Sequence, residues 1–243
     1  MVVLGATSAI ARSIAEQLGM RGFELILAGR DVEEIETLAL DLELRCSVKV
    51  TARSFDALAF ETHRGFFDDC RAASDDTLFG VVLCFGYLGD QAKAQEEFGE
   101  ARQILDTNFL AAVSALNVAA KILEEKGEGF LCALSSVAGD RGRRSNYFYG
   151  AAKAGLTAYL QGLRNRLSAS GVRVITIKPG FVDTRMTFGR PAMFLVASPE
   201  AAARRIVAAI ERGKDVSYVP GFWRPVMIAI RAIPEKIFKR MNL

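Results

Sequence analysis

Short apolar runs alternate with helical patterns along almost the whole chain, and this alternation limits the folds that the chain can adopt. Some runs, such as Val81-Val-Leu-Cys84, are apolar at every position, which is typical of parallel strands that helices cover on both faces. Between the runs, apolar residues recur at helical spacing, as at Ile35, Leu38 and Leu42. Strands are predicted at residues 2–4, 23–28, 48–52, 78–84, 130–134 and 172–177. We therefore predict an α/β fold with a doubly wound parallel sheet of about seven strands flanked by helices.

Length and composition fit a single domain. The chain has 243 residues, of which 51% are hydrophobic and 24% charged, as expected for a globular protein with one large core. No internal repeat or low-complexity linker divides it, so we expect residues 1–243 to form one domain. Because Met1 leads directly into a short first strand, the sequence leaves open whether a few residues precede this start in the native protein.

Charge and cysteine content exclude several classes of function. The net charge is only +3, so we expect no nucleic-acid partner. The four cysteines are widely spaced and form no ligand set with the single histidine, His63, so we expect no metal site. No apolar run approaches the roughly 20 residues that span a bilayer, which favours a cytoplasmic location.

The turn after the first predicted strand has the composition of a nucleotide-binding turn. It reads Gly5-Ala-Thr-Ser-Ala-Ile-Ala11, and its small residues let the backbone approach a pyrophosphate at the N-terminus of the following helix. Gly5, Thr7, Ser8 and Ile10 are the candidate contacts. The alternative is an ordinary tight turn between a strand and a helix, since such turns are common in α/β folds.

The end of the second predicted strand favours NADP(H) over NAD(H). An acidic residue at this place accepts hydrogen bonds from the adenosine ribose, whereas Gly29-Arg30 offers a guanidinium that can contact a 2′-phosphate. The neighbouring Asp31 keeps NAD(H) open as an alternative. If Arg30 does not bind the cofactor, it is a solvated side chain near a helix start.

Tyr149 and Lys153 are the candidate catalytic pair. They are four residues apart in a strongly helical segment, so both project from one face of the helix. A nearby ammonium stabilises a phenolate, which makes the tyrosine a better proton donor at neutral pH. Tyr147 is a rival phenol, but Ala151 stands four residues beyond it and provides no cation.

These residues, in this order, resemble the short-chain dehydrogenase/reductase family. The turn at Gly5 is similar to the family's TGxxxGxG motif, Ser136 precedes Tyr149 by thirteen residues, and Tyr149 and Lys153 match its YxxxK pair. The resemblance extends to Asn108, Asp56-Ala57, Gly86 and the segment Pro179-Gly180-Phe-Val182-Asp-Thr184. It implies a Rossmann-type fold and hydride transfer between a nicotinamide cofactor and a carbonyl or alcohol.

The resemblance also implies a role for each matched residue. Ser136 would hold the substrate oxygen, Lys153 would bind the nicotinamide ribose, and Asn108, within a long helix, would connect the lysine to solvent through water. Asp56 and Ala57 would contact the adenine, and Gly86 the adenosine side. The segment from Pro179, with Gly180, Val182 and Thr184, would bind the nicotinamide carboxamide.

Two departures from the family pattern weaken parts of this prediction. Leu4, Ala9 and Ala11 replace the threonine and two of the glycines of the turn, so extra methyl groups must be accommodated near the cofactor. The family usually has NNAG after the fourth strand, where this chain has Leu83-Cys-Phe-Gly86. Taken singly, each matched residue also has a non-functional explanation. Ser136 can be an ordinary turn residue, Asn108 can be solvated, and Tyr149 and Lys153 can be four residues apart by chance.

The chain also resembles family members that reduce a keto-sugar carried on a polyprenyl phosphate, in the turns Tyr87-Leu-Gly-Asp90 and Ser135–Arg144, the segment from Pro179 to Met186 and the tail. Arg141, Arg143 and Arg144 lie between Ser136 and Tyr149, where they could meet a substrate phosphodiester. The alternatives are a general cytosolic ketone or aldehyde reductase and a non-catalytic NADP-sensing protein. The resemblance further implies a homodimer or homotetramer, joined through the helices that carry Asn108 and Tyr149.

The C-terminal residues 220–243 combine apolar and basic side chains. Such a segment can lie on an anionic membrane surface, or it can pack on its own domain or on a sister subunit. Residues 185–200, with Met186, Phe188, Met193 and Phe194, are expected to form an apolar lid over the substrate.

Overall fold

The computed structural model describes residues 1–186 and 195–241, and within them seven parallel strands form one sheet. The strand order is β3-β2-β1-β4-β5-β6-β7. The strands are β1 (Val2–Leu4), β2 (Leu25–Gly29), β3 (Val50–Ser54), β4 (Gly80–Leu83), β5 (Gly129–Leu134), β6 (Val172–Pro179) and β7 (Val216–Val219). The predicted doubly wound sheet is therefore confirmed.

The chain changes direction once as it crosses the sheet. It runs outward from β1 to β3, returns to place β4 beside β1, and then runs outward again to β7. The loops after β1 and β4 consequently diverge, and they leave a crevice at the carboxyl edge of the sheet, which is where ligands bind in open α/β sheets.

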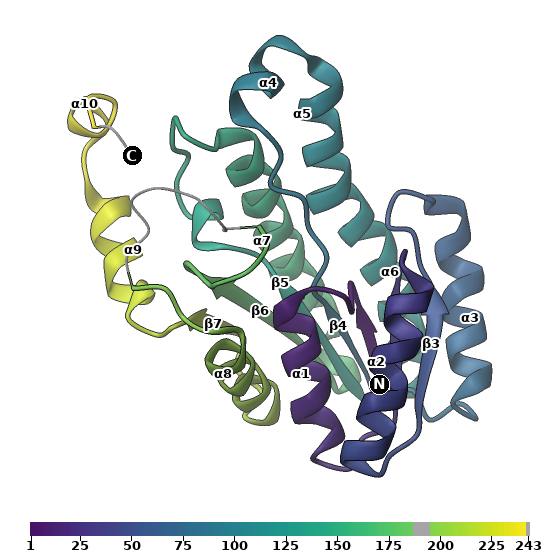
Figure 1. Cartoon of the computed structure of the whole chain (residues 1–243). Helices are drawn as coiled ribbons and strands as arrows, with labels where there is room; N and C mark the ends of the chain where they lie inside the picture. Colours follow the sequence, from purple (N-terminus) through teal and green to yellow (C-terminus); the bar gives the residue numbers. More distant parts are fainter. Residues whose placement is uncertain (187–194, 242–243) are drawn as a thin grey trace.

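Helices cover both faces of the sheet, as Figure 1 shows. One face carries α1 (Ala9–Gly19), α2 (Val32–Cys46) and α8 (Pro199–Glu211). The other carries α3 (His63–Ala73), α6 (Ala111–Lys126) and α7 (Tyr147–Leu167). Two further helices, α4 (Gln91–Glu96) and α5 (Phe98–Leu105), extend beyond the carboxyl edge of the sheet (Figure 1).

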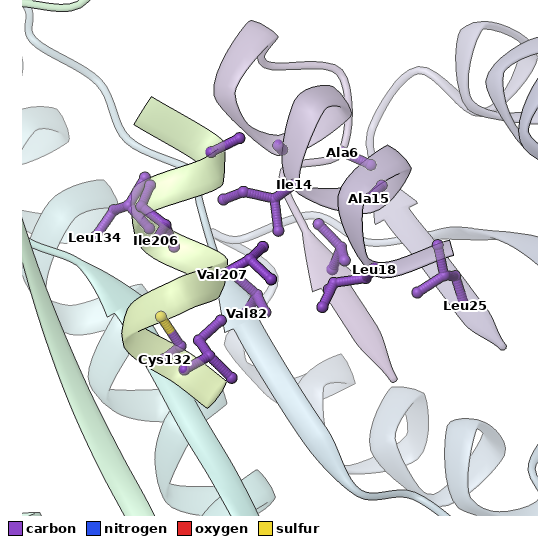
Figure 2. Packing of buried hydrophobic residues seen from close by; sticks show 14 of the residues in the cluster. Ala6, Ile14, Ala15, Leu18, Leu25, Val82, Cys132, Leu134, Ile206 and Val207 are labelled. Carbon is purple, nitrogen blue, oxygen red and sulfur yellow. The ribbon is translucent and has the colours of Figure 1, made fainter. Parts of the chain in front are cut away.

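The core on the first face forms where α1 and α8 meet above the central strands. Ile14 and Leu18 of α1 face Val207 of α8, and Val82 and Cys132 of the sheet lie beneath them (Figure 2). All five side chains are at most 1% exposed. Burial of such apolar side chains stabilises the fold by about 1.5–3 kcal/mol for each large one, and it fixes the strands whose ends carry the site.

Side-chain caps set where three of these helices begin. Ser8 caps α1 and Asp31 caps α2, each through a side-chain oxygen that accepts a backbone N–H three residues on. Ser198 caps α8 in the same way, with Pro199 at the first helical position. Since α1 and α2 follow β1 and β2 directly, these caps also position the turns at the crevice.

Several element boundaries differ from the sequence prediction, and one strand was not placed. Strand β3 begins at Val50 rather than at residue 48, and the helix expected after Asp56 begins only at His63, after a short 3₁₀ turn at Phe60–Thr62. The prediction located six strands and did not place β7. That strand is short and half exposed at the edge of the sheet, so its apolar pattern is weak.

The C-terminal segment forms α9 (Trp223–Ala232) and α10 (Glu235–Phe238). Trp223 and Met227, on the inner face of α9, are buried against Val137. The sequence left open whether this segment lies on a membrane, on its own domain or on a sister subunit. Its inner face packs on its own domain. No helix among the described residues is both long and apolar enough to pass through a membrane.

Candidate active site

The predicted site residues come from loops and helix starts at the carboxyl edge of the sheet. Each of the first six strands contributes residues that follow its last position, and α7 adds the tyrosine and the lysine. The strand-end residues are Gly5 (β1), Arg30 (β2), Asp56 (β3), Gly86 (β4), Ser136 (β5) and Gly180 (β6). Residues spread over the sequence are thus brought to one edge.

Lys153 is a buried cation next to Tyr149. Its side chain is 3% exposed, and its Nζ donates a hydrogen bond to the Leu134 carbonyl at 2.9 Å. Burial lowers the pKa of Lys153 to about 8, and the neighbouring Cys84 partly opposes this shift. The ammonium lies 5.7 Å from the centre of the Tyr149 ring, so the helical spacing does place both groups on one face of α7.

The two serines after β5 have different surroundings. Ser135 is buried, and its hydroxyl bonds the Lys153 carbonyl at 2.9 Å and the Thr157 hydroxyl at 2.8 Å, so it anchors α7. Ser136 is half buried and caps the 3₁₀ turn Val137–Gly139 by accepting the Ala138 N–H at 3.1 Å. Its hydroxyl proton remains available to a ligand, which favours Ser136 as the substrate contact.

Asn108 lies within a long helix, as expected, because a π-helical turn, Asp106–Leu110, joins α5 to α6 without a break and carries it. Such turns are often found at functional sites because they redirect one side chain. The Asn108 amide donates to the carbonyls of Ile104, at 2.8 Å, and Tyr87, and its oxygen accepts the Tyr87 N–H at 3.1 Å. Asn108 therefore holds the segment that follows β4 in place.

Gly86 lies directly against this asparagine and the lysine. A Cβ at Gly86 would come within 2.9 Å of Asn108 Oδ1 and 3.5 Å of Lys153 Nζ. A side chain there would displace the asparagine, which explains why Gly86 is retained although the rest of the family's NNAG segment is replaced.

A second support for this loop was not predicted. Glu100 is only 8% exposed and accepts hydrogen bonds from the Tyr87 hydroxyl at 2.8 Å and the Asp90 N–H at 3.0 Å. Both bonds lower the pKa of Glu100, and the bond from the Asp90 N–H has the larger effect. Thirteen residues separate Glu100 from Tyr87, so no local sequence pattern signals this contact.

The first turn has the geometry that a dinucleotide pyrophosphate needs. Gly5 has φ +77°, and a Cβ on it would come within 2.7 Å of the Phe85 backbone nitrogen, so the position requires glycine. The N–H of Gly5 and of Ala6 bond the Ala28 carbonyl at 2.8 and 3.1 Å. Ala11 is fully buried, so the methyl group that replaces a family glycine packs into the core and away from the cofactor side.

Unpaired donors remain at the start of α1. Ser8 accepts the N–H of Ala11 with its hydroxyl and the N–H of Arg12 with its carbonyl. Within the described residues this leaves the N–H groups of Ala9 and Ile10 to a ligand at the positive end of the helix dipole. The turn therefore fits a phosphate.

Arg30 is exposed beside this turn, whereas the neighbouring acids are occupied. The Asp31 carboxylate accepts the Glu34 N–H at 3.1 Å as the cap of α2. The Glu34 carboxylate pairs with Arg12. A 2′-phosphate at this place would therefore face a guanidinium with no partner among the described residues, and the carboxylates of Asp31 and Glu34, which already have partners.

The candidate adenine contacts are held by a neutral histidine. Asp56 Oδ1 accepts the Leu58 N–H at 3.0 Å, and the Asp56 carbonyl is 3.3 Å from His63 Nε2. The His63 ring stacks on Phe55 at 4.9 Å and bonds the Ser114 hydroxyl at 2.8 Å through Nδ1. Burial lowers the pKa of His63. The histidine thus holds Asp56 and Ala57 in place, a role that its isolation in the sequence did not suggest.

The segment after β6 leads from the sheet toward α9. The Gly180 N–H bonds the Val219 carbonyl at 2.9 Å, and Val182 forms a β-bridge with Ala197. A Cβ at Gly180 would overlap the Trp223 indole, so this glycine lets α9 approach the site. Thr184 follows in the same segment. Of the expected lid, Phe188, Met193 and Phe194 lie outside the described residues.

A buried ion pair joins the loop between β5 and α7 (residues 135–146), which carries the candidate Ser136 and is called the catalytic loop below, to the outer strands. Lys178 at the end of β6 pairs with Asp140, whose side chain is 2% exposed, and the Tyr218 hydroxyl of β7 donates to Asp140 at 2.8 Å. Burial and this hydrogen bond raise the pKa of Tyr218 to about 12. The loop after Ser136 is thereby fixed relative to β6 and β7.

Arg141 contacts the protein itself, contrary to the expected contact with a substrate. Its Nη1 donates to the carbonyls of Ile230 and Ile233 at 2.7 and 2.6 Å, and Nη2 contacts Glu235 at 2.9 Å. Its guanidinium also lies 3.7 Å from the centre of the Phe238 ring. Arg141 therefore fastens α9 and α10 to the catalytic loop, beside which they lie in Figure 1.

Comparison with known proteins agrees with this arrangement. Residues 1–193 match the family model of the short chain dehydrogenases. An uncharacterized oxidoreductase of Mycobacterium tuberculosis (strain H37Rv) is 36% identical over 241 residues, covering 99% of this chain and 96% of the relative. Another from Streptomyces coelicolor is 38% identical over 242 residues, covering 99% and 95%.

Solved structures share the fold at lower identity. A short-chain dehydrogenase from Sphingobium yanoikuyae in complex with NADPH superposes with a TM-score of 0.80 at 23% identity and covers 96% of both chains. Levodione reductase superposes with a TM-score of 0.82 at 18% identity, covering 92% of this chain and 96% of its own. The family model matches most of the chain, the relatives match along its full length, and the site residues occur in the family's order. The chain therefore belongs to the short-chain dehydrogenase/reductase family of enzymes.

Proposed function

We propose that the protein transfers a hydride between NADP(H) and a carbonyl or alcohol, with Tyr149 as the proton donor or acceptor. The supporting observation is the buried Lys153 ammonium, 5.7 Å from the centre of the Tyr149 ring at the carboxyl edge of the sheet. A cation in such a dry position stabilises the phenolate strongly, because little water screens the interaction.

Each site residue has a separate part in this proposal. NADPH, when bound, supplies the hydride. Ser136 holds the substrate oxygen beside Tyr149, which gives its proton to that oxygen or removes it in the reverse direction. Lys153 keeps the phenol acidic and binds the nicotinamide ribose, and Asn108 fixes the loop over the lysine.

NADP(H) is the proposed cofactor, with NAD(H) as the alternative. Arg30 is available to a 2′-phosphate, and the Asp31 carboxylate is engaged as a helix cap. Two structural relatives are described with related ligands: the Sphingobium enzyme with NADPH and a Thermococcus sibiricus alcohol dehydrogenase with 5-hydroxy-NADP. Titration of the wild type and Arg30→Ala with both cofactors tests this, because Arg30→Ala should weaken NADPH binding at least tenfold and leave NADH binding unchanged.

Tyr149→Phe tests the catalytic assignment. We expect it to lower kcat at least hundredfold, the range typical of a general acid, and to spare NADPH binding. Tyr159→Phe is the matched control and should retain activity, because Tyr159 is on the same helix but packs against the core on that face of the sheet. If Tyr149→Phe retains activity, the assignment is wrong.

For the substrate, we propose a keto-sugar carried on a polyprenyl phosphate, as used by decaprenylphosphoryl-2-keto-ribose reductase, which the chain resembles. The cations Arg143 and Arg144 near the catalytic loop support a phosphorylated substrate. The alternatives are a general ketone or aldehyde reductase and a non-catalytic NADP sensor. A panel of neutral ketones, free keto-sugars and lipid-linked keto-sugars distinguishes the three, since a sensor oxidises NADPH with none of them.

We also propose that the outer face of the C-terminal segment lies on an anionic membrane. Ile228 and Ile237 are 59% and 57% exposed, and basic residues surround them. The exposed basic residues of the segment, besides Lys239, are Arg224, Arg231, Lys236 and Arg240. Their charge complements anionic lipids, and the isoleucines can enter the interface.

Vesicle flotation tests the membrane proposal. Deleting residues 220–243 would expose the core around Trp223, so substitutions on the outer face are the better test. Ile228→Ser with Ile237→Ser should reduce binding to vesicles that contain phosphatidylglycerol. Zwitterionic vesicles should bind weakly in every case, and equal flotation of variant and wild type would refute the proposal.

A further inference from the structure

A cavity of about 280 Å³ opens between the catalytic loop and the C-terminal segment. This volume is close to the lower end of the range for ligand pockets, about 300–1,000 Å³. Arg143, Arg144 and Tyr147 line it from the loop and the start of α7, and Phe238, Lys239 and Met241 line it from the C-terminal side. The contacts of Arg141 with α9 and α10 hold these two walls together.

The lining of the cavity carries excess positive charge. Arg143, Arg144 and Lys239 contribute three cations, and Glu235 contributes one carboxylate. Glu235 already pairs with Arg141, at 2.9 Å, which itself lies over the Phe238 ring. The carboxylate therefore does not neutralise the three cations of the cavity.

Arg143 is the most informative of the three cations. It is half buried, and desolvation lowers its pKa although Asp140 opposes the shift. Its Nε is buried without a hydrogen-bond acceptor among the described residues, and its Nη2 contacts only the Met227 sulfur, at 3.5 Å. A partly desolvated guanidinium with few acceptors is costly, and an oxyanion in the cavity would accept hydrogen bonds from the side of Arg143 that lines it.

The cavity and the proposed reaction centre are built on the same two elements. Tyr147, in the cavity wall, lies on the first turn of α7, the helix that also carries Tyr149, and the loop with Arg143 and Arg144 begins just after Ser136. A long substrate held at Ser136 and Tyr149 whose distal part follows this loop would reach the cavity. The apolar side chains of Phe238 and Met241 can contact an alkyl chain beside the anionic group.

We propose that this cavity is a substrate subsite for a phosphate group that bears an apolar chain, with Arg143, Arg144 and Lys239 as its ligands. The inference rests on the proposed function, since it extends the same site to the distal part of the substrate. The set of phosphate ligands differs from the three loop arginines predicted from the sequence. Arg141 is excluded because it contacts the C-terminal segment, and Lys239 is added because it lines the cavity.

Binding to the NADPH-saturated enzyme tests the subsite, because saturation removes competition at the cofactor phosphates. The probes are decyl phosphate below its aggregation concentration, decanol and inorganic phosphate, each measured by calorimetry. Decyl phosphate should bind at least tenfold more tightly than decanol, and inorganic phosphate should compete with it. Inorganic phosphate binding as tightly as decyl phosphate would overturn the role of the apolar wall.

Substitutions then locate the effect. Arg144→Gln with Lys239→Gln should weaken decyl phosphate binding at least tenfold and change decanol binding less than twofold. The matched control, Arg212→Gln with Lys214→Gln, removes two exposed cations beyond the end of α8 and should change neither. Equal losses in both double variants, or no loss in the first, would overturn the subsite.

Activity on a small neutral ketone separates the two proposals. If the wild type oxidises NADPH with neutral ketones but shows no preference for decyl phosphate over decanol, the subsite is wrong and the proposed function stands. If no carbonyl compound is reduced, the proposed function fails whatever the phosphate probes bind.

Discussion

Lys153 should make the stability of this protein depend on pH in a way that one substitution removes. Its burial lowers the pKa from 10.5 to about 8, so the folded state releases a proton that the unfolded state still holds. Between these two pH values the unfolded state binds more protons, and the free energy of unfolding rises with pH. Below pH 8 both states are protonated, and the cost of burying the ammonium is fully present.

The size of this effect follows from the two pKa values. At about 1.4 kcal/mol for each pH unit, the gap between 10.5 and about 8 corresponds to about 3 kcal/mol in total. From pH 7 to about pH 9.5, where most of the change falls, the contribution is about 2 kcal/mol. Lys153→Met should lack this contribution, because methionine fills similar space without a charge.

The assay is urea unfolding of the cofactor-free protein at several pH values between these limits. The free energy of unfolding of the wild type minus that of Lys153→Met should rise by about 2 kcal/mol from pH 7 to about pH 9.5. Other titrating groups cancel in this difference, and the lost bond to Leu134 only adds a constant to it. Lys121→Met, at an exposed position, controls for the loss of a positive charge. Parallel curves for the wild type and Lys153→Met would refute the reasoning, and the variant should also lose at least hundredfold in kcat/KM.

Three further substitutions test other parts of the structure. Gly180→Ala should cost about 1–3 kcal/mol, because its Cβ overlaps Trp223, and fluorescence of this single tryptophan should report the displacement of α9. Asp140→Asn should cost about 3–5 kcal/mol in urea unfolding, because it leaves Lys178 buried without its partner charge. Gly86→Ala should lower kcat/KM at least tenfold with a small change in melting temperature, because its Cβ displaces the amide that holds the loop over the lysine.

Local patterns predicted most of the fold because they act over short distances. Apolar runs at β4 and β5 and helical spacing at α2 are set by neighbours in the chain, and the doubly wound sheet follows from their alternation. The same holds for the catalytic pair, since four residues on a helix place Tyr149 and Lys153 on one face. The weak pattern of β7, half exposed at the sheet edge, was insufficient to locate it.

Contacts between distant segments could not be predicted in this way. Glu100 bonds Tyr87 across 13 residues, His63 bonds Ser114 across 51, and Asp140 pairs with Lys178 across 38, and no periodicity spans these gaps. Arg141 looked like its two neighbouring arginines in the sequence, yet the folded chain brings α9 to it and leaves the cavity to the others.

The sequence by itself therefore determined the fold class, the family and the spacing of the candidate catalytic pair, because these depend on residue type and local spacing. Only the tertiary structure decided that Lys153 is buried, which cations face a cavity, and how the C-terminal segment packs. Burial and desolvation depend on which segments meet in space, and that is set by the packing of the whole core.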